Sequence, residues 1–321
     1  MVLGVDGGNT KTIALVATLE GVVVGSGRGG CSDIYSWPTP DPAIAELTAV
    51  ADAALAAAGV RRSDIRAAVF SLAGADWPED FELLGSALRR WLDGEPVVLN
   101  DAIGAIHCGI PTGIGVAIVC GTGSAVGARG EDGGVFLIGF WPDSSGATVL
   151  GSDALAAVYR EGLGTGDPTA LTPAALTRYE VTSPIELLHV FTCRGETGAR
   201  STASFARTVL DVAAAGDRVA ARIVREHAEI LAAQARASAA RVSLPRPYPL
   251  VLAGPVFRHE AGELARLVVK AQPEAEWVPA RLEPAAAAVW AALRSVGAPH
   301  DALDALAETT PGPELFATDA P

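Results

Sequence analysis

The hydrophobic residues at the start of the chain fall into three short runs, at residues 2–5, 12–19 and 22–24. Each run is rich in β-branched residues, and the breaks between them contain glycine and other turn-forming residues. This pattern is typical of short β-strands, whereas the apolar residues of a surface helix recur every three or four positions. The first 24 residues therefore predict an antiparallel meander of three strands.

The pattern then alternates between helical and extended segments. Asp41 and Pro42 supply an N-cap and a proline suited to the first helical turn, ahead of an Ala/Leu-rich stretch that ends at Gly59. A strand at residues 65–72, a helix at 79–92, a strand at 96–99 and a short helix after Asp101 follow. The element order is β-β-β-α-β-α-β-α, and we expect a first domain over residues 1–110.

A second copy of the opening pattern lies at residues 114–128, where an apolar run meets a Gly-rich turn and a further strand follows. Helical patterns dominate after it, most clearly at residues 217–242, before a last strand at 248–252. Two more helices are expected near residues 258–271 and 283–296. This order predicts the α/β class and a duplicated fold, with residues 111–296 as the second domain.

The last part of the chain, residues 297–321, is rich in proline, alanine and acidic residues and contains no lysine or arginine. Such a composition offers little apolar surface to bury against a core. We expect these residues to form a frayed or loosely docked acidic tail.

Length and charge narrow the class of protein. A chain of 321 residues agrees with two domains, since one domain commonly takes ~100–200 residues. The net charge is −13, and no stretch gathers lysine and arginine into a stripe, so we expect no nucleic-acid partner. No run of about 18 apolar residues occurs, and the N-terminus lacks the layout of a signal peptide. We expect a cytoplasmic protein with no membrane partner.

The first candidate site is the segment Asp6-Gly7-Gly8-Asn9-Thr10-Lys11-Thr12, directly after the first predicted strand. Paired glycines let backbone N–H groups approach phosphate oxygens, because no Cβ stands in the way. Asp6 at the strand end is suited to hold Mg²⁺ through water, and Lys11 could add positive charge near the phosphates. The alternative is an ordinary hairpin turn with a capping aspartate. No Walker A sequence occurs, so an ATP site must be of another kind.

Two further segments are weaker signals on their own. Gly121-Thr122-Gly123-Ser124 repeats the Gly-rich turn after the second apolar run, although any tight turn could have this sequence. Asn100-Asp101-Ala102 places one carboxylate at the junction of a strand and a helix, where an aspartate commonly serves only as an N-cap. Two strand–turn–strand units could grip the phosphates of a nucleotide from both sides of a cleft.

In this order and spacing, the three segments resemble the motifs of the actin, Hsp70 and hexokinase superfamily. Over nearly the whole chain up to about residue 296, the sequence is similar to the N-acetylglucosamine kinase and BadF/BadG/BcrA/BcrD ATPase family. The resemblance implies two ribonuclease-H-like, actin-like ATPase domains with a nucleotide cleft between them. It also implies ATP and Mg²⁺ as cofactors.

The resemblance assigns roles to these segments. It implies that residues 6–12 bind phosphates, with Asp6 positioning Mg²⁺, and that residues 121–124 form the second phosphate turn. Asp101 corresponds to the general base. The stretch 251–257 resembles the adenosine motif, with Gly254 as its glycine and Pro255 where a second glycine is common. Ala287 and Ala288 stand in the closing helix, where the family has Gly-Ala.

One departure from the family concerns the sugar site. Family sugar kinases carry an acid pair in a G-W-G-x-x-x-G-D-E-G-S segment, and here either Ala147 and Thr148 or Val149 and Leu150 replace it. We therefore expect that N-acetylglucosamine is not the best acceptor. The candidate acceptor contacts are Asp33, Asp76, Asp101, Trp141 and Asp143, although loop polarity and packing explain Asp33, Trp141 and Asp143 equally well.

These observations favour an ATP-dependent kinase that phosphorylates a small sugar, amino sugar or cyclitol, with a homodimer as an open expectation. One alternative is a nucleotide or sugar sensor with weak catalysis, which the missing acid pair keeps open. Another is an ATPase activator of a partner enzyme, but such activators hold an iron–sulfur cluster through interface cysteines. Cys31, Cys108, Cys120 and Cys193 are widely spread and form no C-x-x-C pair, which disfavours a cluster or a zinc site.

Overall fold

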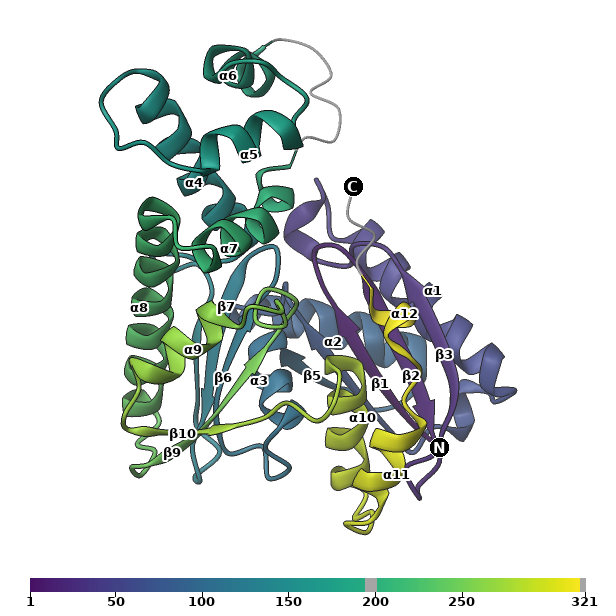
Figure 1. The fold of residues 1–321 in the computed structure, drawn as a ribbon. Helices are drawn as coiled ribbons and strands as arrows, with labels where there is room; N and C mark the ends of the chain where they lie inside the picture. Colours follow the sequence, from purple (N-terminus) through teal and green to yellow (C-terminus); the bar gives the residue numbers. More distant parts are fainter. Residues whose placement is uncertain (194–200, 318–321) are drawn as a thin grey trace.

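The computed structural model describes residues 1–193 and 201–317, and in these it contains two five-stranded mixed sheets (Figure 1). The first sheet has the order β3-β2-β1-β4-β5, with β1 (Val2–Gly7), β2 (Thr12–Ala17), β3 (Val23–Gly29), β4 (Ala67–Leu72) and β5 (Val97–Asn100). The second has the order β10-β9-β6-β7-β8, with β6 (Gly115–Cys120), β7 (Ser124–Arg129), β8 (Val135–Ile138), β9 (Tyr248–Ala253) and β10 (Ala275–Val278).

The two sheets are copies of one topology. In each, the first strand pairs antiparallel with the next strand in sequence and parallel with the strand that follows the first helical crossover. The prediction of a duplicated α/β fold is therefore confirmed, including the second strand–turn–strand unit with its turn at residues 121–123 between β6 and β7. The edge strands β8 and β10 have no counterpart among the predicted elements.

The first half of the chain adds α1 (Asp41–Ala58), α2 (Pro78–Leu92), α3 (Asp101–Ala105) and the short 3-10 segments η1 (Ile34–Ser36), η2 (Arg62–Asp64) and η3 (Ile106–Cys108). The second half adds α4 (Ala147–Gly162), α5 (Leu171–Arg178), α6 (Pro184–Thr192), η4 (Thr202–Phe205), α7 (Ala206–Ala214), α8 (Arg218–Arg241), α9 (Glu263–Lys270) and α10 (Pro284–Ser295). Figure 1 shows α4–α6 as a helical layer at one end of the molecule. No helix in the described residues is long and apolar enough to cross a membrane.

The central strands are buried on both faces, which explains their nearly continuous apolar sequence. On β1 and β2, alternate side chains face opposite layers: Leu3 and Val5 belong to the core under α1, whereas Ile13 and Leu15 belong to the core under α10. Every residue of β2 is fully buried. The first sheet is therefore a rigid support for the turn that joins β1 to β2.

Each half of the molecule packs a helix against the sheet of the other half. Helix α3 follows β5 but packs against β6 and β7, and α10 follows β10 but packs against β1 and β4. Glycines permit these close contacts: a Cβ on Gly4 would lie 2.2 Å from the backbone nitrogen of Val289 in α10. The limits of the two domains stay a prediction, although α10, which we expected in the second domain, lies on the first sheet.

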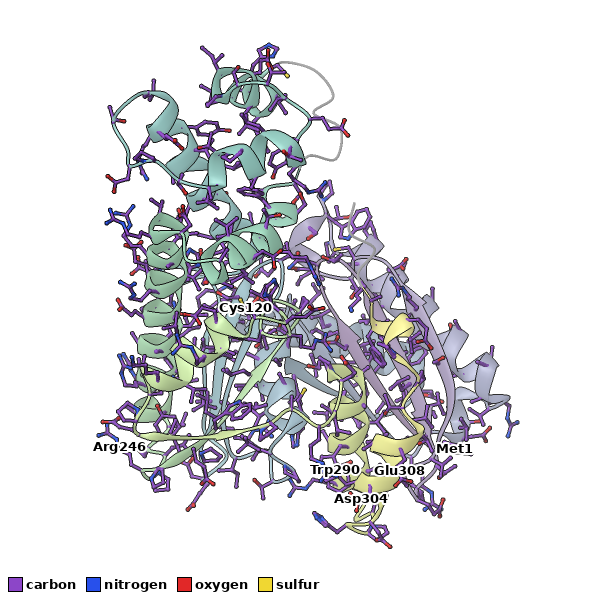
Figure 2. All side chains as sticks on the ribbon, viewed as in Figure 1. Met1, Cys120, Arg246, Trp290, Asp304 and Glu308 are labelled. Carbon is purple, nitrogen blue, oxygen red and sulfur yellow. The ribbon has the colours of Figure 1, made fainter. Side chains whose placement is uncertain are left out.

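The C-terminal tail, which we expected to be frayed or loosely docked, is not frayed over residues 302–316. These residues form α11 (Ala302–Thr309) and α12 (Pro313–Phe316), which bury Leu303, Leu306 and Phe316. The Arg28 guanidinium of β3 donates to the carbonyls of Glu314 and Leu315 at 3.1 and 2.9 Å. Figure 2 shows Trp290 of α10 close to Asp304 and Glu308 of α11, at the end of the molecule opposite α4–α6. The acidic composition of residues 297–321 gave no indication that these three apolar side chains pack against the rest of the protein.

Candidate functional site

A cavity of about 520 Å³ lies between the carboxyl ends of the two sheets. Both predicted phosphate turns line it, together with side chains from the loops after β4, β8 and β9. Most of the predicted site residues meet there, namely Asp6, Gly7, Gly8, Asn9, Thr10, Lys11, Asp33, Asp76, Asp101, Gly121, Thr122, Gly123, Ser124 and Gly254. Residues more than 240 positions apart in the sequence therefore share one cleft.

The first turn, residues 8–11, is held by hydrogen bonds from its surroundings. The Gly8 N–H donates to the Lys11 carbonyl at 3.0 Å, and the Gly8 carbonyl accepts from the Ser32 N–H at 3.1 Å. The side-chain carbonyl of Asn9 accepts from the Ser36 hydroxyl at 2.8 Å. The turn is therefore fixed to the loop that carries Asp33 and η1.

The second turn, residues 121–123, approaches the first directly. The hydroxyls of Thr10 and Thr122 lie 3.1 Å apart, which joins the two halves of the molecule across the cleft. On its other side, Gly254 has a φ of 102°, and a Cβ there would lie 2.4 Å from the carbonyl oxygen of Cys120. Glycine is required at this position by both the positive φ and the space.

The carboxylates of the cavity raise one another's pKa. Burial and the neighbouring Asp101 raise the pKa of Asp6 to about 7. Burial also raises the pKa of Asp101 to about 6, although a hydrogen bond from the Ala102 N–H opposes this, and Asp33 adds to it. The pKa of Asp76 is raised to about 7 by burial and by Asp101, Asp33 and Asp80. A cluster of mutually destabilised carboxylates in a cleft is a common mark of a functional site.

Asp101 stands at the first position of α3 and is oriented by local contacts. The Asn100 side chain caps the helix by accepting from the Ala102 N–H at 2.9 Å, and Asp101 Oδ1 accepts from the same N–H at 2.8 Å. The Asn100 amide also donates to Asp76 Oδ1 at 3.1 Å. Asn100 thus caps the helix. The cap therefore does not depend on Asp101, whose second carboxylate oxygen takes no part in it.

Two cations and one further carboxylate line the same cavity. Lys11 donates through Nζ to the carbonyl of Phe316, and burial lowers its pKa while Asp6 raises it. Arg258, after β9, pairs with Glu283, which precedes α10. In the described residues, Lys11 and Arg258 are the cations that line the cavity.

Three of the predicted site residues do not line the cavity. Thr12 is fully buried behind the turn, where its hydroxyl donates to the Gly30 carbonyl at 2.8 Å and contacts the Ser32 hydroxyl at 2.7 Å. Trp141 is exposed and lies against Phe136. Asp143 is exposed with a φ of 61°, and its carbonyl accepts from Gln234.

Several cavity residues escaped the sequence analysis, namely Phe140, Ser144, Ser145, Arg258, Glu283 and Phe316. A polar residue on an otherwise apolar helix face could have singled out His227 of α8, which stands among Val224, Ala228 and Leu231 and contacts Ser145. The sequence did not predict that Arg258 and Glu283 line the cavity, because their ion pair forms only once the chain has folded.

Comparison with known proteins supports this arrangement. Residues 3–295 match the BadF/BadG/BcrA/BcrD ATPase family. The chain belongs to this family. A curated relative, the N-acetylmuramic acid/N-acetylglucosamine kinase of Clostridium acetobutylicum, is 28% identical over 235 residues, which cover 72% of this chain and 76% of the relative.

Solved structures show that this BadF/BadG/BcrA/BcrD member has the actin-like two-domain fold. A Porphyromonas gingivalis protein assigned as an N-acetylglucosamine kinase superposes with a TM-score of 0.68 at 22% identity, covering 92% of this chain and 99% of the other. A ROK family glucokinase of Streptomyces griseus, solved with glucose and AMPPNP, gives 0.55 at 20% identity and covers 92% and 98%. The family description implies use of ATP.

The cavity suits Mg²⁺ that arrives with a nucleotide. The described residues contain no group of three or more His, Cys, Asp or Glu that could hold a metal ion alone. Mg²⁺ is commonly bound through one or two carboxylates, several waters and substrate phosphates, so an all-protein cage is not needed. Burial and the neighbouring Asp101 raise the pKa of Asp6 although Lys11 opposes them, so a divalent ion held there would add positive charge beside two buried carboxylates.

Proposed function

We propose that this BadF/BadG/BcrA/BcrD member is an ATP-dependent kinase that transfers the γ-phosphate of ATP to a hydroxyl of a small sugar, amino sugar or cyclitol. The observation that carries the proposal is the contact of Thr10 with Thr122 above a cavity lined by Asp6 and Asp101. Two glycine-rich turns can then hold one phosphate chain from both sides, next to a carboxylate that can take a proton. The names of the relatives support a sugar as the acceptor.

In this proposal Asp101 is the general base. Its pKa of about 6 leaves the carboxylate ionised near pH 7.5, yet makes it more basic than an ordinary aspartate. The carboxylate accepts the proton of the attacking hydroxyl as the oxygen bonds to the γ-phosphorus and ADP leaves. Little covalent chemistry is asked of the protein, because positioning and charge stabilisation dominate phosphoryl transfer.

The phosphate side of the site is assigned to the two turns, Lys11 and Asp6. The turns orient the phosphates, and Asp6 holds Mg²⁺ through water. Bound Mg²⁺ neutralises charge on the phosphate oxygens. Closing the cleft around the nucleotide and acceptor excludes water and so limits idle hydrolysis of ATP.

The acceptor side is assigned to the end of the cavity that carries Asp33, Asp76 and Phe140. The Phe140 ring, from the second half, lies edge-on to Tyr35 at 5.2 Å and parallel to Trp77 at 6.4 Å between centroids, and both partners come from the first half. Tyr35 donates to the buried Asp80, which also accepts from the Trp77 N–H at 2.8 Å. Of these three rings Phe140 lines the cavity, together with the carboxylates of Asp33 and Asp76. An aromatic side chain with carboxylates in the same lining is suited to a ring that has an apolar face and hydroxyls on its edge.

The test is acceptor-dependent turnover. MgATP should raise the thermal stability of the protein, by about 3 kcal/mol at 100 times the dissociation constant. ADP release should then rise when a mixed pool of sugars and cyclitols is added. Binding of MgATP without any acceptor-dependent ADP release would instead support a sensor, and no response to millimolar MgATP would exclude both.

A further inference from the structure

Three side chains outside the predicted motifs form a hydrogen-bonded chain that leads to the second phosphate turn. The Ser145 hydroxyl lies 2.7 Å from His227 Nδ1, and His227 Nε2 lies 2.9 Å from Asp153 Oδ2. Ser145 precedes α4, His227 belongs to α8, and Asp153 belongs to α4. Ser145 and His227 are 1% and 2% exposed, whereas the Asp153 side chain is half exposed.

The direction of each hydrogen bond among Ser145, His227 and Asp153 follows from the carboxylate of Asp153. An ionised carboxylate only accepts hydrogen bonds, so His227 Nε2 carries the proton between it and Asp153. In the neutral imidazole, Nδ1 is then an acceptor, and the Ser145 hydroxyl donates to it. Every polar atom of the His227 ring thus has a partner inside an otherwise apolar helix face. The order of groups matches that of a hydrolase triad, but the two ring nitrogens are exchanged and the serine is buried.

The loop that contains Ser145 lies directly on the second phosphate turn. The Ser145 N–H donates to the Ser124 hydroxyl at 3.0 Å, the Ala147 N–H to the Gly121 carbonyl at 2.8 Å and the Thr148 N–H to the Thr122 carbonyl at 3.0 Å. These contacts fix both ends of the turn. Any shift of the loop must therefore move the turn.

No space separates the loop from the turn. Gly146 between them has a φ of 104°, and a Cβ there would lie 2.4 Å from the backbone of Gly123. Ser145 is the residue of this loop that is anchored into the core below, because its hydroxyl bonds to His227 while its N–H bonds to the turn. Ser145 also lines the cavity.

We propose that Ser145, His227 and Asp153 are positioning residues that hold the turn at residues 121–124 in the geometry that binds the phosphates of ATP. The proposal rests on the proposed function, since it takes this turn to be a phosphate site. His227 supports the serine, and Asp153 fixes the tautomer of His227. The proposed role requires a polar side chain at position 227, because an apolar one could fill the same space but could not bond to the Ser145 hydroxyl.

The test measures nucleotide binding directly, by titration of the full chain with MgATP. Ser145→Ala, His227→Gln and Asp153→Asn should each raise the dissociation constant of MgATP, by about ten-fold for loss of one oriented hydrogen bond. The KM for the acceptor should stay within about two-fold, because the acceptor end of the cavity is untouched. His227→Asn should restore most of the affinity, since its shorter amide lies near Nδ1 and can still contact Ser145, whereas glutamine lies near Nε2.

The chain offers a matched control. His259 Nε2 pairs with Asp211 Oδ1 at 3.0 Å, and the side chains are 7% and 63% exposed, against 3% and 54% for His227 and Asp153. Neither Asp211 nor His259 lines the cavity. Asp211→Asn should therefore leave the affinity for MgATP unchanged, although it changes the same kind of His–Asp contact.

Two outcomes in the variants overturn the proposal. An unchanged dissociation constant in Asp153→Asn and Ser145→Ala would reduce the chain to a packing contact, and an equal loss in Asp211→Asn would make the effect a general one of stability. Failure of the proposed function looks different: the wild-type protein would bind MgATP but phosphorylate no acceptor, and the variants would still report on the turn. A wild-type protein that does not bind MgATP would overturn both.

Discussion

The ammonium group of Lys11 donates a hydrogen bond to the backbone carbonyl of Phe316, 305 residues later in the chain. Lys11 stands in the first phosphate turn, and the Phe316 side chain is buried where it lines the same cavity. Phe316, in a C-terminal segment that has no lysine or arginine of its own, thus lies beside the turn proposed to bind phosphate. Its docking and the order of that turn are physically linked.

Replacing Phe316 with alanine should therefore affect the core and the nucleotide site together. Truncation of a buried phenylalanine commonly costs about 3–5 kcal/mol, and a small peripheral contact such as this one belongs at the lower end. We expect a lower melting temperature and weaker MgATP binding, measured by thermal unfolding and titration. Glu314→Ala is the control, because that side chain is exposed. A melting temperature equal to that of the wild type would mean that α12 is not docked in solution.

Asparagine in place of Asp101 tests the proposed base. The variant should keep the fold, because Asn100 rather than Asp101 is the residue that caps α3. General-base removal commonly costs about 10²–10⁴-fold in rate, so kcat should fall by such a factor while the dissociation constant of MgATP changes little. In the wild type, kcat/KM should decline as the pH falls below about 6, where Asp101 becomes protonated. Full activity in Asp101→Asn would return this residue to a purely local role.

The sequence predicted those elements whose formation depends on residues close together in the chain. Strands β1, β2, β6 and β7 and the turns between them follow from short apolar runs and glycines, and the motif residues from Asp6 to Lys11 lie in the cavity as their spacing suggested. What escaped prediction depends on contacts between distant segments. The close approach of α10 to Gly4, the docking of Phe316 and the contact of His227 with Ser145 each join parts of the chain at least 80 residues apart. Composition also misled at the tail, where a few buried side chains outweigh many acidic ones.

The stability of the nucleotide-free protein should fall as the pH rises. The folded-state pKa values of Asp6 and Asp76 are raised to about 7 and that of Asp101 to about 6, above the ordinary aspartate value. A group with a raised folded-state pKa contributes stability that is present below its unfolded pKa and is lost as the pH rises through the folded pKa. We therefore expect the melting temperature to decrease between about pH 4 and pH 7.

The control for this profile is Asp76→Asn, which removes one of the three groups and should flatten the profile. Asn100 can still donate to the new amide oxygen, so the local contact is kept. Mg²⁺ should stabilise the protein more at pH 8 than at pH 5, because the carboxylates bind a cation only when ionised. A melting temperature that rises with pH over this range, or a Mg²⁺ effect independent of pH, would contradict the cause given for these pKa values.

The last prediction concerns the acceptor and keeps the expectation that N-acetylglucosamine is not the best one. Neither Ala147 nor Thr148 offers a carboxylate, and their N–H groups are already bonded to the second phosphate turn, while Val149 adds an apolar side chain to the cavity. A carboxylate that accepts from a sugar hydroxyl contributes about 1.5–3 kcal/mol, so the missing acid pair lowers the affinity for a fully hydroxylated family sugar. Asp33 and Asp76 supply carboxylates from the opposite half, which favours a ring with a different placement of its hydroxyls.

The measurement is the ratio of kcat/KM among N-acetylglucosamine, glucosamine, glucose and deoxy or cyclitol analogues. We expect an analogue with fewer or differently placed hydroxyls to exceed N-acetylglucosamine. Asp76→Asn should raise the KM of that acceptor by about ten-fold and leave the KM of ATP unchanged, because Asp76 lies at the acceptor end of the cavity. If N-acetylglucosamine exceeds the others with a kcat/KM in the usual range of about 10⁴–10⁸ M⁻¹s⁻¹, then Asp33 and Asp76 replace the acid pair fully and the prediction fails. If Asp33 and Asp76 do replace the acid pair, Asp76→Asn should raise the KM of N-acetylglucosamine as much as the KM of any other acceptor.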